Sequence, residues 1–117
     1  MSKIDIKPAT EDSIEEYYGR KAPQTIRGFV AVKDDKVVGI AGYYLFDHKI
    51  VMFADLNKEL KIEKRVLVKG IQMVMDLIEN TKLPIYAMCD RSIEGAEMLL
   101  SHTGFVNVYG DVWQLSR

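Results

Sequence analysis

The sequence contains a single cysteine, Cys89, and only 3 prolines among its 117 residues. One cysteine excludes a disulfide within the chain, so we expect a protein of a reducing compartment. Long apolar runs are absent too, and none approaches the roughly 20 residues that a membrane-spanning helix needs. The amino terminus alternates charged and apolar residues and lacks the apolar core of a signal peptide. We therefore expect a soluble, cytoplasmic protein.

Neither sign of charge predominates, because 16 Lys and Arg side chains stand against 17 Asp and Glu, for a net charge of −1. A general nucleic-acid-binding protein or a polybasic membrane-surface protein needs a large positive field, which this chain lacks. Histidine is scarce as well, and the spacing of His48, His102 and Cys89 does not suggest a metal site. We expect no nucleic-acid partner, no membrane partner and no metal.

Apolar residues are plentiful and make up 48% of the sequence. A domain of this length buries roughly two-thirds of the surface that its unfolded chain exposes, which suffices for a core without disulfides. No internal repeat, low-complexity tract or linker divides the sequence. We predict a single domain that spans residues 1–117.

The first half of the chain carries strand patterns separated by short polar turns. Thr10 is suited to cap a helix at Glu11–Tyr18, and Gly19 is suited to end it. The polar turns at 34–36 and 47–49 lie between apolar segments, which indicates an antiparallel meander. The strands that these patterns predict lie at residues 4–6, 26–33, 37–46 and 50–55.

The second half begins with a helical pattern at residues 64–80. Its apolar residues recur at the spacing of one helix face, and they are Leu67, Ile71, Val74, Met75 and Ile78. Pro84 follows this helix and precedes a short apolar run at 85–89 that is typical of a buried strand. The strand at 50–55, the helix and this second strand therefore predict a crossover between parallel strands.

A last helix and a hairpin complete the predicted chain. Asp90 or Ser92 is expected to cap the helix, and Gly104 to end it in a left-handed conformation, with Phe105 against Leu100. Strands at 106–109 and 112–115, joined by a Gly-Asp turn, form the hairpin. The predicted order is β-α-β-β-β-α-β-α-β-β. It corresponds to an α/β (α+β) fold with a mixed sheet, a central antiparallel meander and helices on both faces.

Three stretches of the sequence resemble the GNAT superfamily of acyl-CoA N-acyltransferases. "IDIKPATEDSIEEY" is similar to the usual opening strand and acidic helix start, and "FVAVKDDKVVGIAGYYL" to the second and third strands. "MCDRSIEGAEMLLSHTGF" is similar to the late strand and helix that end in Gly-Phe. Together these stretches cover most of the chain, in the family's order.

The resemblance implies a site for acetyl-CoA or another acyl-CoA. In that family the pantetheine lies between the fourth strand, here 50–55, and the strand after the long helix. The pyrophosphate lies at the start of that helix, here 59–65, where backbone N–H groups favour an anion. The cofactor-binding residues that the resemblance implies are Phe53, Ala54, Asp55, Lys61, Lys64, Arg65 and Asp90.

Several family features are missing from this sequence. The family's phosphate-binding turn contains glycines, whereas the matching stretch from Glu59 to Lys64 contains none. Five cations cluster around this stretch and either bind phosphate or form a solvated helix face: Lys58, Lys61, Lys64, Arg65 and Lys69. The family's proton-donating tyrosine corresponds to Leu100, and the loop at 20–25 leaves little of the acceptor wall.

Candidate catalytic residues follow from the chemistry of amine attack on a thioester. Asp55 is the candidate base, and backbone N–H groups near 53–55 are candidates to polarise the carbonyl. Tyr86 is a candidate proton source, together with Tyr43 and Tyr44. The alternative interpretation makes Asp55 a strand-ending residue and the tyrosines sheet-packing residues. The acceptor would be an amine of a small molecule or of a protein.

A second function remains open from the sequence. The missing glycines and the missing tyrosine are also compatible with a catalytically inactive GNAT-fold protein that serves in interaction or assembly. The basic helix start, the Cys-Asp-Arg-Ser turn and the terminal Trp-Gln-Leu resemble small phage-encoded proteins, including internal virion proteins of podophages. This interpretation implies a virion-associated location and a homodimer or a phage protein as partner.

Overall fold

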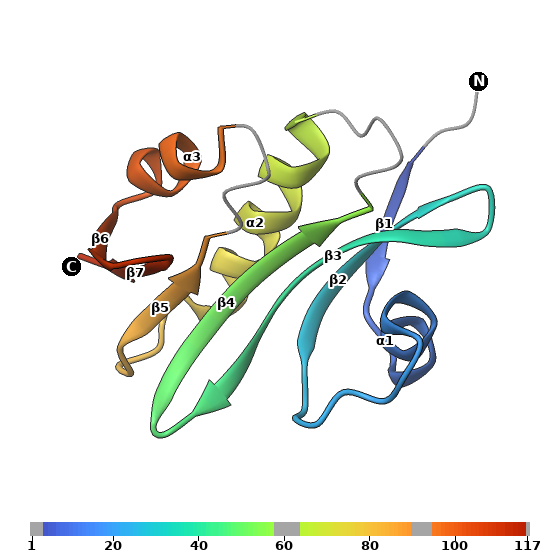
Figure 1. Ribbon diagram of the computed structural model, residues 1–117, viewed down its shortest axis with the longest axis horizontal. Coiled ribbons are helices and arrows are strands. Elements are labelled where there is room, and N and C mark those ends of the chain that lie inside the picture. The colour runs from blue at the N-terminus through green and yellow to red at the C-terminus, as the bar shows by residue number, and fades with distance from the viewer. Residues whose placement is uncertain (1–3, 58–63, 90–94, 117) are drawn as a thin grey trace.

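The computed structural model describes residues 4–57, 64–89 and 95–116, and the predicted order of elements is confirmed (Figure 1). The elements are β1 (Asp5–Pro8), α1 (Glu11–Tyr18), β2 (Arg27–Lys33), β3 (Lys36–Phe46), β4 (Lys49–Leu56), α2 (Lys64–Ile78), β5 (Ile85–Met88), α3 (Ala96–His102), β6 (Phe105–Tyr109) and β7 (Val112–Leu115). No helix among these has the length and hydropathy that a membrane span requires.

One mixed sheet contains the seven described strands, in the order β1-β2-β3-β4-β5-β7-β6. Strands β1 to β4 form the predicted antiparallel meander. Strand β5 runs parallel to β4, as the crossover pattern predicted, and the terminal hairpin adds β7 antiparallel to β5. The sheet is therefore antiparallel except at the β4–β5 junction.

Helix α1 covers one face of the meander. Thr10 and Ser13 form a capping box, in which Thr10 Oγ1 accepts from Ser13 N–H at 3.1 Å and Ser13 Oγ accepts from Thr10 N–H at 2.8 Å. Gly19 ends the helix in the left-handed conformation, at φ 75°. The buried Ile14 packs against Val30 and Ile40. The predicted bounds and both predicted ends of this helix are confirmed.

Helices α2 and α3 lie on the opposite face of the sheet (Figure 1). The buried stripe of α2 consists of Leu67, Ile71, Val74 and Ile78, four of the five residues that the helical spacing singled out. They pack with Ile50 and Met52 of β4 and with Ile85 and Ala87 of β5. The main core thus lies directly behind the β4–β5 junction.

The start of α3 corrects one prediction, because the helix begins at Ala96 and its N-cap is Gly95, without a side-chain cap. Asp90 and Ser92 are therefore not its caps, and both lie outside the described residues. The predicted end is confirmed, since Gly104 has φ 97° and its N–H donates to the Ser101 carbonyl at 3.2 Å. Strand and helix bounds otherwise differ from prediction by one or two residues.

Candidate functional site

Strands β4 and β5 separate after a short stretch of pairing. Their ladder contains three pairs, from Ile50–Ile85 to Met52–Ala87. Strand β4 continues to Leu56 and remains paired with β3 over its whole length. Past Met52, β4 therefore has no ladder partner on its β5 side among the described residues.

The backbone of Ala54 faces this gap. Ile50 N–H donates to the Pro84 carbonyl at 2.9 Å, toward β5, whereas Asn57 N–H donates to the Val38 carbonyl at 2.8 Å, toward β3. Alternate residues of a strand direct their backbone polar groups to opposite sides. The N–H and C=O groups of Ala54 consequently point toward β5, beyond the last ladder pair.

The end of β5 shows why the gap opens. Cys89 N–H donates to the Asp111 carbonyl at 2.8 Å, so the chain after Met88 follows the terminal hairpin rather than β4. Strand β7 holds β5 through three pairs, which end at Met88–Val112. The separation of β4 from β5 is thus fixed by hydrogen bonds on both outer sides of the gap.

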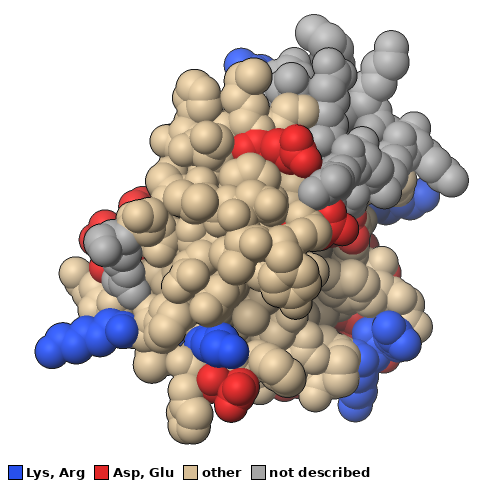
Figure 2. Space-filling view, turned by 60° about the vertical axis from the view of Figure 1, so that its left-hand side comes forward, with Lys and Arg blue, Asp and Glu red and all other residues tan. Residues whose placement is uncertain are grey.

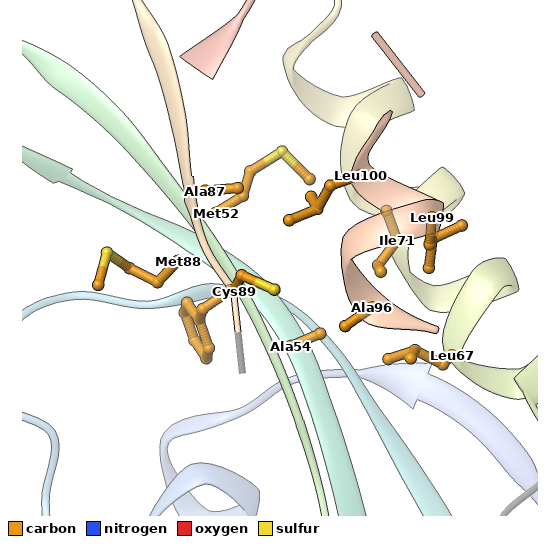
Figure 3. A pocket seen from close by; sticks show the side chains of 11 residues that line it. Met52, Ala54, Leu67, Ile71, Ala87, Met88, Cys89, Ala96, Leu99 and Leu100 are labelled. Carbon is orange, nitrogen blue, oxygen red and sulfur yellow. The ribbon is translucent and has the colours of Figure 1, made fainter. Parts of the chain in front are cut away.

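An apolar cavity of about 40 Å³ lies behind the gap, between the two strands and helices α2 and α3 (Figure 3). Three alanines, Ala54, Ala87 and Ala96, and the buried Cys89 lie among its walls. Leu100 also lines it. The other lining residues are Met52, Phe53, Leu67, Ile71, Met88 and Leu99. Small side chains keep the gap open at its inner end.

A second, larger cleft lies on the opposite face of the sheet, beside α1. Its volume is about 280 Å³. Its walls come from the end of α1, the following loop, β3 and β4: Tyr18, Arg20, Lys21, Ala22, Pro23, Gln24, Ile26, Tyr44 and Phe53. Phe53 lines this cleft and the apolar cavity alike. The two hollows therefore adjoin at the β4 residue that precedes Ala54.

The second cleft contains a group with a shifted pKa. Burial raises the pKa of Tyr18 above its ordinary value of 10.0, and the charge of Asp55 and the neighbouring Tyr44 raise it further. The Tyr18 hydroxyl is therefore protonated at neutral pH. Asp55 lies on the same face as Phe53, which packs with the α1 side, because side chains alternate along β4. The structure thus brings Tyr18, Tyr44 and Asp55 together.

Two of the residues predicted as catalytic, Asp55 and Tyr86, lie on the same side of the sheet. Asp55 follows the last β4–β5 pair on β4, and Tyr86 precedes it on β5, where it pairs with Val51. Side-chain alternation places Tyr86 on the face opposite Ile85 and Ala87, the face that also carries Asp55. The ammonium of Lys49 lies 5.7 Å from the centre of the Tyr86 ring.

The predicted phosphate site falls mostly outside the described residues. Lys61 and Asp90 lie outside the described residues. Lys64 is the first residue of α2, and its side chain is not described. Arg65 is exposed on the first turn of that helix, as is Lys69 one turn later. The hypothesis of a cationic phosphate patch therefore stays a prediction.

Tyr18 was not among the predicted site residues. Its position at the end of an acidic helix gives no signal of a site, because only the tertiary fold carries the end of α1 to β4. Tyr44 was named as a candidate, and the structure places it in the same cleft. Tyr43 packs instead against the main core, on the α2 side.

The described surface also carries exposed apolar side chains on α3 and β6. Figure 2 turns the side of the molecule that carries these elements toward the viewer, and most of the described surface in this view is uncharged. The most exposed of these side chains are Met98 at 67% and Tyr109 at 71%, with Val106 and Val108 above half. Exposed apolar side chains that form a contiguous patch are typical of interaction sites.

Comparison with known proteins gives matches among solved structures. No protein-family model matches the sequence, and no curated protein matches it significantly. Among solved structures, the chain is similar to a "putative acetyltransferase" from Sphaerobacter thermophilus DSM 20745, with a TM-score of 0.62 and 10% sequence identity. The similarity covers 96% of this chain and 90% of that chain. At this identity the similarity shows the fold alone.

Proposed function

We propose that this chain binds an acyl-CoA, acetyl-CoA in the first instance, and transfers the acyl group to an amine. The observation that carries the proposal is the gap between β4 and β5. There the backbone N–H and C=O groups of Ala54 point away from β3, the strand with which β4 is paired. The fold shared with an acetyltransferase-like structure supports the same function.

The residues around the gap fit a pantetheine arm. Its amides would pair with the N–H and C=O groups of Ala54 as an additional strand would. The methyl groups of Ala54, Ala87 and Ala96 leave room beside the gap, and the apolar wall formed by Leu67 and Leu99 excludes water from it. Arg65, on the first turn of α2, would face the phosphates at the outer end.

Three groups supply the chemistry of the transfer. The acceptor nitrogen attacks the thioester carbonyl carbon, the carbon–sulfur bond breaks, and the sulfur leaves as a thiolate that takes a proton. Asp55 would accept the proton of the amine, and the N–H of Ala54 would donate to the carbonyl oxygen. The hydroxyl of Tyr86, on the same face of β5, would protonate the thiolate.

Replacement of Ala54 by proline tests the site of binding. Proline removes the N–H that faces the gap and leaves the β3 ladder intact, because Ala54 makes no ladder bond toward β3. We expect calorimetry to show acetyl-CoA affinity about tenfold weaker than wild type, the value of one hydrogen bond. Ala54→Ser, which keeps the N–H, is the matched control. Equal affinities for both variants and the wild type would contradict the proposal.

Replacement of Asp55 by asparagine tests the base. We expect acyl transfer to slow by about 10²-fold or more, with acetyl-CoA affinity unchanged within a factor of two or so. The measurement is the release of free CoA thiol in the presence of a panel of amines. An Asp55→Asn variant with wild-type turnover would assign the base to another group.

The exposed apolar side chains on α3 and β6 favour a second candidate, a non-catalytic interaction protein. We expect this function if acetyl-CoA does not bind at millimolar concentration and if sedimentation shows self-association. Replacement of Met98 and Val106 by glutamate would then abolish the association, because it places charge in an apolar interface. A phage source and a virion location belong to this alternative and stay predictions from the sequence.

A further inference from the structure

We propose that the cleft beside α1 is the acceptor site and that it selects a small amine carrying a carboxylate, of the size of an amino acid. The inference rests on the proposed acyl transfer and names its second substrate. It is carried by the position of the cleft, by the two cations that line it with Asp55 nearby on β4, and by its size.

The position of the cleft gives an acceptor access to the thioester. Phe53 lines both the cleft and the apolar cavity behind the gap, and Ala54, whose backbone faces the gap, is the next residue. An amine held against Phe53 is therefore adjacent to the place where the thioester carbonyl would lie. The base proposed above, Asp55, lies on the same face of β4, close enough to raise the pKa of Tyr18 in the cleft wall.

The charged groups around the cleft differ in sign. Arg20 and Lys21 line it on the loop that follows α1, where both side chains are exposed. Asp55 lies outside the lining, on the same face of β4 as Phe53, and its charge acts on Tyr18 in the cleft wall. An amino acid bound with its ammonium group toward Asp55 and its carboxylate toward Arg20 and Lys21 would have both of its charged groups near charges of opposite sign. An amine without an anion would leave the two cations unpaired.

The size of the cleft matches a small acceptor. Its volume of about 280 Å³ lies just below the range of roughly 300–1,000 Å³ for small-molecule sites. The rings of Tyr44 and Phe53, 6.0 Å apart and tilted by 45°, form an aromatic wall that favours an ammonium group or an apolar side chain. A cleft of this volume suits an acceptor of the size of an amino acid.

The test compares each amino acid with its carboxamide. L-leucine, L-phenylalanine and their carboxamides are titrated into the wild-type chain saturated with acetyl-CoA, and binding and thiol release are both measured. We expect each carboxylate to bind at least about tenfold more tightly than its carboxamide. A preference for the carboxamides, or equal affinity within each pair, would overturn the inference.

Reversal of the charges of Arg20 and Lys21 tests whether these two residues select the carboxylate. Arg20→Glu with Lys21→Glu should weaken binding of the amino acids at least about tenfold, with little effect on the carboxamides and on acetyl-CoA. Lys82→Glu, an exposed cation in the loop before β5, is the matched control. Equal weakening of both acceptor classes would overturn the assignment of these two residues.

The two proposals fail in different ways. Absence of acetyl-CoA binding in the wild type contradicts the proposed function and leaves the carboxylate preference measurable on the chain without CoA. Binding of acetyl-CoA together with equal affinity for amino acids and carboxamides keeps the proposed function and overturns the acceptor class.

Discussion

Neighbouring side chains of β4 serve opposite faces of the sheet. Ala54 contributes its methyl group to the cavity beneath the gap, whereas Phe53 and Asp55 belong to the face that carries the cleft. The alternation follows from the pleat of a strand. One strand thereby supplies the backbone groups for one substrate and the side chains for the other in the proposed reaction.

At the residue scale, Tyr18 makes the free energy of unfolding decrease as the pH rises through the alkaline range. Its pKa is raised in the folded chain, so above its ordinary value of 10.0 the unfolded chain loses the proton first. The contribution of Tyr18 is fully present below pH 10 and is lost as the pH rises through the folded pKa. We expect wild type to lose stability relative to Tyr18→Phe above pH 10, with a constant difference at lower pH.

Urea unfolding of both proteins between pH 8 and about pH 11 measures this difference. Tyr109→Phe is the matched control, because it removes a hydroxyl from a ring that is 71% exposed. Parallel pH profiles for wild type and Tyr18→Phe would contradict the prediction.

At the element scale, unequal strand lengths create the gap. Strand β4 has 8 residues and pairs with β3 along its length, whereas β5 has 4. After Met88 the chain bonds toward the hairpin, so β4 loses its neighbour at the level of Ala54. A longer β5 on the same ladder would close the site by pairing with Ala54. The gap is therefore a property of two elements together.

Helix α1 forms one wall of the cleft and depends on its capping box. Thr10→Ala removes the oxygen that accepts from Ser13 N–H, and we expect a loss of about 1 kcal/mol in the free energy of unfolding. The midpoint of urea unfolding measures the loss, with an unchanged slope. Thr25→Ala, in the exposed loop after α1, is the matched control. A Thr10→Ala variant as stable as the control would contradict the role of the cap.

At the scale of the whole molecule, the sheet separates the cavity from the cleft. Helix α1 covers part of one face, and α2 and α3 cover the other (Figure 1). The cavity and the cleft therefore lie on opposite sides of the sheet. In the proposed reaction, the two substrates would approach the same point of β4 from opposite faces, with Phe53 as the wall that they share. The proposal therefore implies a sequential reaction, with both substrates bound together.

Binding at the gap should stabilise the whole fold. A ligand that binds only the native state raises the free energy of unfolding by about 2.7 kcal/mol at a hundred times its dissociation constant. For a domain of this size we expect acetyl-CoA to raise Tm by roughly 10 °C at that concentration. Thermal unfolding with dephospho-CoA, which lacks only the 3′-phosphate, measures the contribution of that phosphate, and adenosine, which lacks the arm and all phosphates, measures the contribution of the nucleoside. No shift with any of the three would contradict binding.

Local chemistry in the sequence was sufficient to predict the elements and their order. Thr10, Ser13 and Gly19 define α1 through contacts within one turn of chain, and the apolar spacing from Leu67 to Ile78 defines the buried face of α2. These signals are short-range, so they can be recognised without the fold. The prediction of a cap at Asp90 or Ser92 was wrong, because α3 begins at Ala96 and its N-cap is Gly95.

The candidate site was predictable only in part. The sequence pointed to β4 and Asp55, because a resemblance in element order transfers positions along a strand. It offered Tyr43, Tyr44 and Tyr86 as proton donors, but no motif selected among them. It gave no sign of Tyr18, which lines the cleft because the fold places the end of α1 beside β4. It also could not show which backbone groups of β4 face the gap, since this depends on hydrogen bonds to β3 and β5.

The sequence by itself thus determined the elements, their order and the buried faces, because capping, turn chemistry and periodicity act over a few residues. Only the tertiary structure decided where β4 and β5 separate, that the backbone of Ala54 faces the gap, and that Tyr18 and Asp55 share a cleft. Those features arise from pairing and packing between segments distant in the chain, and no local pattern of residues encodes them.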